Sequence, residues 1–129
     1  MAATQATDVF SVDSDDLGEA VSLVVVRGSV SLAETRALEG AALASVLRGR
    51  RTVIVDLRRV TRVGGGLLGG ILRMRRGLTV VDGHLALVVD GPPIDELVEA
   101  TVLRALVSVA TTPEEALACV GDGSARWNG

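Results

Sequence analysis

Apolar residues follow two different spacings along this chain of 129 residues. Strand-like segments lie at 8–12, 20–28, 52–57, 85–89 and 105–110, and the segment 52–57 is a near-continuous apolar run of strand length. Such runs are typical of strands that are covered on both faces, as in a largely parallel sheet. The polar, acidic segment at 13–19 separates the first two runs and is predicted to be a hairpin connection.

Between these runs, apolar residues recur at the spacing of helices. The segment 31–47 starts with Ser31 and Glu34, a pair that predicts a capping box at the helix start. A glycine-rich stretch at 64–70 opens the next helix, and a short helix is expected at 92–102. The last helix, at 111–120, has strong start signals: Thr112 as cap, Pro113 at the first position and Glu115 closing the box.

The helix after the glycine stretch is amphipathic. Its apolar side chains fall on one broad face: Leu67, Leu68, Ile71, Leu72 and Met74. The opposite face carries Gly69, Arg73 and Arg76. Arg73 and Arg76 are three residues apart, so both are expected to project from the same side of the helix.

This order of elements, β-β-α-β-α-β-α-β-α, predicts a single α/β domain. Strands that alternate with helices imply right-handed crossovers, and the opening hairpin makes the sheet mixed. We therefore expect a mixed sheet of four or five strands with about four helices packed against it. The domain is predicted to span residues 8–120, between flexible ends at 1–7 and 121–129. Val53, Val55, Leu87 and Val88 are predicted to be buried.

Composition narrows the functional classes. The formal net charge of −3 gives no signature of nucleic-acid binding. Cys119 is the single cysteine, which excludes an internal disulfide and favours a reducing cytoplasm; we expect it to be a small buried side chain on the last helix. The sequence shows no signal peptide and no apolar run long enough to span a membrane.

The glycines raise a nucleotide-binding hypothesis. Gly64, Gly66 and Gly69 spell G-x-G-x-x-G. A dinucleotide site also requires an acidic residue about twenty positions further on, at the end of the next strand. The nearest acid, Asp82, belongs to an Asp-Gly turn before that strand, so nucleotide binding is kept only as the weaker alternative.

Other candidate chemistry is sparse. His84 is the only histidine, and with one cysteine the chain offers neither a metal-ligand set nor a catalytic triad. We therefore expect no enzyme activity, no metal and no cofactor. Nine arginines and one acid, Asp56, lie between residues 48 and 76. Docking to an acidic partner and a merely solvated surface both remain open for this basic segment.

Several stretches resemble the STAS domain of bacterial anti-sigma factor antagonists. They are "VVVRGSVSLAE", "TVIVDLRRVTRV", the loop that opens "LLGGILRMRR", "GHLALV" and "TTPEEAL". The resemblance implies a mixed sheet with packed helices and a role in binding an anti-sigma factor that is a serine kinase. In that family, the kinase switches the antagonist off by phosphorylating a serine in the loop.

This chain departs from the family at the switch. The family loop reads Asp-Ser-Ser/Thr-Gly-Leu, and the corresponding positions here are Gly64, Gly65, Gly66, Leu67 and Leu68. The phospho-acceptor position is Gly65, which has no hydroxyl group. Ser31 replaces a family Asp, but both residues are good helix caps. Thr61 is the nearest hydroxyl before the loop.

The resemblance therefore suggests a regulatory binding module without its phosphorylation switch. Its predicted partner-binding residues are Gly64, Gly65, Gly66, Leu67, Arg73 and Arg76. The partner would be an anti-sigma factor kinase or a related signalling protein, without direct nucleic-acid binding or membrane insertion. A subunit bound to a transporter ATPase is the alternative within the same fold, and a homodimer is left open.

Overall fold

The computed structural model describes residues 9–99 and 103–122, and its elements follow the predicted order with one additional helix. The strands are β1 (Ser11–Asp16), β2 (Val21–Val30), β3 (Thr52–Val63), β4 (His84–Val88) and β5 (Ser108–Ala110). The helices are α1 (Leu32–Leu47), α2 (Leu67–Val80), α3 (Ile94–Glu99), α4 (Leu103–Leu106) and α5 (Pro113–Asp122).

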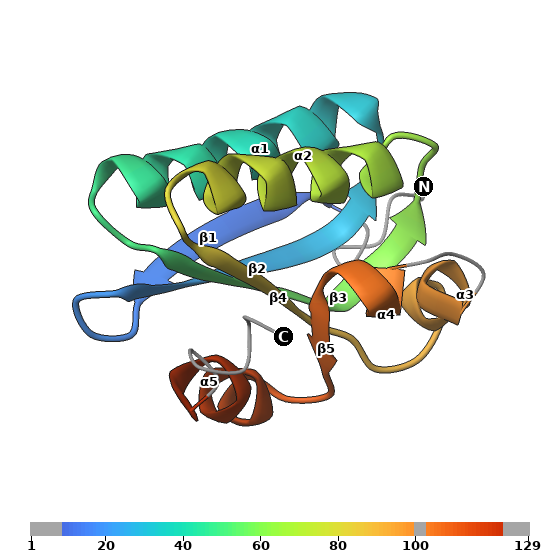
Figure 1. The fold of residues 1–129 in the computed structure, drawn as a ribbon. Helices are drawn as coiled ribbons and strands as arrows, with labels where there is room; N and C mark the ends of the chain where they lie inside the picture. Colours follow the sequence, from blue (N-terminus) through green and yellow to red (C-terminus); the bar gives the residue numbers. More distant parts are fainter. Residues whose placement is uncertain (1–8, 100–102, 123–129) are drawn as a thin grey trace.

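The strands form one mixed sheet in the order β1-β2-β3-β4-β5. The opening pair β1 and β2 is antiparallel, and every other neighbouring pair is parallel. Helices α1 and α2 lie side by side on one face of the sheet, whereas α5 lies on the other (Figure 1). The predicted α/β class with a mixed sheet is confirmed.

Two apolar clusters, one on each side of the sheet, hold these layers together. The larger cluster joins the sheet to α1, α2, α3 and α4, and includes Val53, Val55 and Leu87. The smaller one joins the sheet to α5 and includes Ile54 and Val88. Successive strand residues point to opposite faces, so a strand covered on both sides must be apolar at every position. All four residues predicted to be buried have no exposed surface.

The helix starts have the predicted capping hydrogen bonds, except that one of them has a different donor. At α1 the capping box is formed, and the Ser31 N–H donates to Glu34 Oε1 at 3.2 Å. At α5 the Glu115 N–H donates to Thr112 Oγ1 at 3.0 Å, as predicted. The Glu115 carboxylate, however, accepts from the N–H of Thr111 rather than from that of Thr112, at 2.7 Å.

Several predicted boundaries were wrong in the strands. The first strand starts at Ser11 and runs through the acidic residues assigned to the hairpin connection, because Ser11–Asp16 pairs in register with β2. The connection itself is shorter and lies between Asp16 and Val21. The third strand continues past Leu57 to Val63, because its second half still pairs with β2.

The C-terminal part also differs from the prediction. The strand expected at 105–110 contains only Ser108–Ala110, and residues 105 and 106 belong to α4. The flexible ends predicted at 1–7 and 121–129 lie outside the described residues, except residues 121 and 122, which belong to α5. Cys119 was expected to be buried, but it is exposed on α5.

Candidate functional site

The glycine loop Gly64–Gly66 connects the end of β3 to the start of α2 and lies against the junction between β2 and α1. The Gly64 N–H donates to the Val30 carbonyl oxygen at 2.7 Å, which fixes the start of the loop beside that junction. Both α1 and α2 start at this edge of the sheet (Figure 1). The loop is therefore bordered by two helix starts.

The three loop glycines differ in the space around them. A Cβ at Gly64 would lie 3.0 Å from Ser31 Cα and from the Val30 carbonyl oxygen. A Cβ at Gly66 would lie 2.8 Å from Leu32 Cδ1. Gly65 is exposed, and a Cβ there would meet nothing within 4 Å. Gly65, which the sequence resemblance predicts to occupy the phospho-acceptor position, is therefore the loop position with open space for a side chain.

Gly70, in the first turn of α2, has a packing role. It is buried, and a Cβ there would lie 2.3 Å from Thr35 Cγ2 and 3.1 Å from Glu39 Oε2, both on α1. The absence of a side chain lets the two helices approach closely. Part of the glycine enrichment thus serves the contact between α1 and α2 rather than the loop.

Leu67 must be removed from the predicted partner-binding residues. It has no exposed surface and belongs to the larger apolar cluster, because it lies on the core-facing side of α2. The apolar side chain that is exposed beside the loop is Leu32, the first residue of α1, with an exposed fraction of 52%. Leu32 was not among the partner-binding residues predicted from the sequence, although it directly follows the capping Ser31.

Arg73 and Arg76 share the exposed side of α2, as predicted, but their surroundings differ. The Arg73 guanidinium donates two hydrogen bonds to the Glu39 carboxylate of α1: Nε to Oε1 at 3.0 Å and Nη2 to Oε2 at 2.8 Å. These hydrogen bonds lower the pKa of the Glu39 carboxyl and raise that of Arg73. The Arg76 side chain is exposed and makes no hydrogen bond or ion pair with a described residue.

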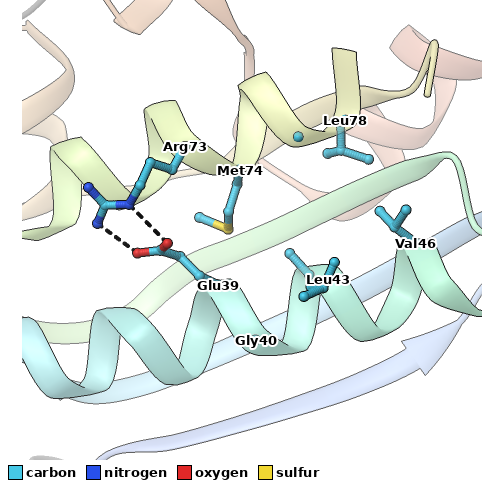
Figure 2. Close-up of a pocket in the computed structure, with 9 residues that line it drawn as sticks. Glu39, Gly40, Leu43, Val46, Arg73, Met74 and Leu78 are labelled. Atoms are coloured by element: carbon cyan, nitrogen blue, oxygen red, sulfur yellow. Dashed lines mark hydrogen bonds and ion pairs between the residues drawn. The ribbon is translucent and has the colours of Figure 1, made fainter. Parts of the chain in front are cut away.

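An apolar groove of about 270 Å³ runs between α1 and α2 next to this ion pair. Figure 2 shows Leu43 and Val46 of α1 facing Met74 and Leu78 of α2, with the pair of Glu39 and Arg73 beside them. Leu43 has an exposed fraction of 58%. The outer surface of the two helices is thus partly apolar as well as basic.

The geometry does not favour the nucleotide hypothesis. A dinucleotide site needs an acidic residue at the carboxyl end of the strand after the helix, close to the glycine loop. Asp82 instead lies at the opposite end of α2, before β4 starts. At a rise of about 1.5 Å per residue, α2 separates Asp82 from the loop by roughly 20 Å. Gly64, Gly66 and Gly69 therefore do not form a dinucleotide site with Asp82.

Thr61 lies on β3 rather than in the loop. It lines a pocket with Ser11, Arg27 and Arg59 of the first three strands. Its hydroxyl is therefore in a different environment from Gly65. Within the described residues, no group of three or more His, Cys, Asp or Glu side chains is placed to hold a metal ion.

Comparison with solved structures identifies the fold. A crystal structure of an anti-sigma factor antagonist from Mycobacterium paratuberculosis matches with a TM-score of 0.81 at 26% sequence identity, over 92% of this chain and 100% of that chain. The anti-sigma factor antagonist SpoIIAA in its unphosphorylated form matches with a TM-score of 0.67 at 14% identity, over 88% and 99% of the two chains. Phosphorylated SpoIIAA, a Bacillus cell fate determinant, matches with a TM-score of 0.67 at 18% identity, over 85% and 99%.

The fold is thus that of the STAS domain of the anti-sigma factor antagonists, and the resemblance inferred from the sequence is confirmed for the fold. No family model matches the sequence, and no match was found among the curated proteins. Across the described residues, no helix has the length and hydrophobicity of a membrane span.

Proposed function

We propose that this chain is a non-catalytic regulatory module that binds a protein partner through the β3–α2 loop and the adjoining surface. The docking surface consists of Gly64, Gly65, Gly66, Leu32 and Arg76. The partner is an anti-sigma factor with a serine kinase domain, or a related signalling protein, and the interaction takes place in the cytoplasm. Because Gly65 has no hydroxyl, the module binds without being switched off at this position.

The observation that carries the proposal is the environment of Gly65. It is the exposed point of the loop and has open space around it, and the sequence resemblance predicts that the family carries the phosphate at this position. Exposed Leu32 lies beside the same loop and offers an apolar anchor of the kind that contributes most to protein interfaces when buried. The surface suits a docked partner even though the modifiable group is missing.

Charge adds a second contribution to the docking surface. Arg76 is exposed and makes no ion pair with a described residue, so its guanidinium is available to a carboxylate of the partner. Arginine forms bidentate contacts with carboxylates and is common at interface hot spots. Arg73 is excluded from the surface here because Glu39 already holds its guanidinium.

The experiment is an affinity capture from the native host with immobilised wild-type protein and with Gly65→Asp. A side chain fits at Gly65, so the variant should fold while its negative charge opposes the partner. Ala118→Asp, at an exposed position on α5, introduces the same charge on the other side of the sheet. We expect mass spectrometry to identify an anti-sigma factor kinase that is retained by wild type and Ala118→Asp and depleted with Gly65→Asp.

Two results would contradict the proposal. Equal capture by Gly65→Asp and wild type would show that the loop is not the docking surface. Specific recovery of a transporter ATPase, again lost with Gly65→Asp, would keep the docking surface but assign the module to the alternative function.

A further inference from the structure

A second pocket lies on the sheet face opposite α1 and α2, at the carboxyl ends of β2 and β3. It has a volume of about 590 Å³ and lies beyond the point at which β4 stops pairing with β3. Three arginines, two hydroxyl residues and two valines line it: Arg27, Arg58, Arg59, Ser11, Thr61, Val9 and Val60. Arg58 and Arg59 of the basic segment and Arg27 of β2 thus surround one cavity.

Two irregularities in β3 explain how so many polar side chains face the same way. Between the paired positions Asp56 and Arg59, β3 contains one residue more than β2, and it contains another between Val60 and Arg62. At each bulge, two successive side chains of β3 point to the outer face of the sheet, and the next side chain points inward again. Val60 therefore stays in the larger apolar cluster, whereas Arg58 and Arg59 are both exposed.

The register places three of the lining residues in one row across the sheet. Ser11 of β1 is paired with Arg27 of β2, and Arg27 is paired with Arg59 of β3. Neighbouring strands lie about 4.8 Å apart, so the two guanidinium groups start from adjacent positions on the same face. Like charges directly opposite one another destabilise a sheet. Neither Arg27 nor Arg59 makes an ion pair with a described residue that would offset this repulsion.

Arg58, unlike Arg27 and Arg59, forms an ion pair with a described residue. Its Nε and Nη2 donate to the two oxygens of the buried Asp56 carboxylate, at 3.0 and 2.8 Å. These hydrogen bonds fix the guanidinium at the wall of the pocket and leave its Nη1 group for another acceptor. Asp56 neutralises this one charge, so the pocket retains the two charges of Arg27 and Arg59.

We propose that this pocket binds a small phosphomonoester, with its phosphate group between Arg27 and Arg59. A phosphate monoester carries a charge of about −1.5 to −2 at neutral pH, which matches two guanidinium groups and exceeds the single charge of a carboxylate. Arginine presents a planar fork of donors that fits phosphate oxygens. The hydroxyl groups of Ser11 and Thr61 supply further donors.

The size of the pocket indicates that the ligand is more than a phosphate ion. Small-molecule sites typically have volumes of about 300–1,000 Å³, and the volume of this pocket lies within that range. Val9 at the wall offers an apolar contact for the organic part of the ester. This inference concerns the opposite sheet face and does not depend on docking at the glycine loop.

The test is a titration of the purified protein with phenyl phosphate, inorganic phosphate and benzoate, followed by calorimetry and by backbone amide shifts. Phenyl phosphate should bind most tightly, because it combines the dianion with an apolar group, and benzoate should bind least. The amide shifts should be largest at the carboxyl ends of β2 and β3. Arg27→Gln and Arg59→Gln should each weaken phenyl phosphate binding about tenfold or more, because each removes a charge-assisted contact.

Arg76→Gln is the matched control, since it removes the same charge from an exposed arginine on the other sheet face. Both pocket variants should keep or raise the melting temperature, because each relieves the repulsion between Arg27 and Arg59. Thr61→Val, at an exposed strand position, is an additional variant that tests the site if either arginine variant fails to fold. Undetectable binding of phenyl phosphate, equal binding of benzoate, or an equal loss with Arg76→Gln would overturn the proposal.

Discussion

Arg73 of α2 and Glu39 of α1 form a bidentate ion pair, with Nε–Oε1 and Nη2–Oε2 distances of 3.0 and 2.8 Å (Figure 2). The pair joins the two helices that cover one face of the sheet. It also changes the role of an arginine that the sequence assigns to partner docking. The Arg73 guanidinium is thus paired with Glu39, whereas the Arg76 side chain on the same side of α2 makes no ion pair with a described residue.

This ion pair predicts an acid-dependent loss of stability. Its hydrogen bonds lower the pKa of Glu39 in the folded state below the ordinary value of 4.5. A carboxyl with a lowered folded-state pKa stabilises the protein above its unfolded pKa, and this contribution is lost as the pH falls through the folded-state pKa. Glu39→Gln should therefore lower the melting temperature at pH 7, and the difference from wild type should shrink below pH 4.5.

Thermal unfolding across this pH range measures the effect. Glu96→Gln, at an exposed carboxylate of α3, is the control and should leave the melting temperature nearly unchanged at pH 7. A difference between Glu39→Gln and wild type that stays constant from pH 7 to strongly acidic solution would show that the ion pair is not its source.

The glycines of α2 provide a pair of opposite predictions. Gly70→Ala places a methyl group 2.3 Å from Thr35 Cγ2, so α1 and α2 must separate, and such overpacking costs about 1–3 kcal/mol. Gly77→Ala, on the exposed side of the same helix, meets nothing within 4 Å. It should increase the free energy of unfolding by about 0.5–1 kcal/mol, because glycine is the poorer helix former. Urea unfolding of both variants checks the signs, and a destabilised Gly77→Ala or a neutral Gly70→Ala would contradict this assignment.

The central strands and helix starts could be predicted because their determinants are local. Val53 and Val55 belong to an apolar run that only a covered strand satisfies, and Ser31 with Glu34 defines a helix start by itself. The second half of β3 was missed because Arg58, Arg59 and Arg62 break the apolar run. That part pairs with β2 through two bulges, and bulges carry no pattern that a period of two residues would reveal.

The candidate site was predicted only in part because its composition depends on contacts between distant segments. The position of the loop followed from the resemblance to the STAS domain. Which glycine is free could not be deduced, since Gly64, Gly66 and Gly70 are constrained by residues of the β2–α1 junction and α1. For the same reason, the sequence did not reveal that Leu32 is exposed and Leu67 is buried. Burial at a helix start depends on how the helix meets the sheet.

The difference between Arg73 and Arg76 predicts separable effects on partner binding and stability. Arg76→Glu should weaken capture of the partner, with little change in melting temperature, because its side chain is exposed and contacts no described acid. Arg73→Glu should lower the melting temperature, since it places a second carboxylate beside Glu39. Capture assays and thermal unfolding of the two single variants measure both quantities. If Arg76→Glu binds the partner like wild type, this arginine is only solvated.

The last prediction concerns the missing switch. With glycine at 64, 65 and 66, the loop offers no hydroxyl, so a partner kinase should bind the chain and leave the loop unmodified. Gly65→Ser restores the family's acceptor at the position with open space, and its phosphate would lie at the start of α2, where free amides and the helix dipole favour an anion. We expect the kinase with ATP to phosphorylate Gly65→Ser but not wild type, and the added charge to release the partner. Mass spectrometry of both proteins locates the phosphate, and Ala118→Ser on α5 controls for a serine that is merely exposed. Stoichiometric phosphate on Thr61 of wild type, coupled to release of the partner, would show instead that the switch has moved to β3.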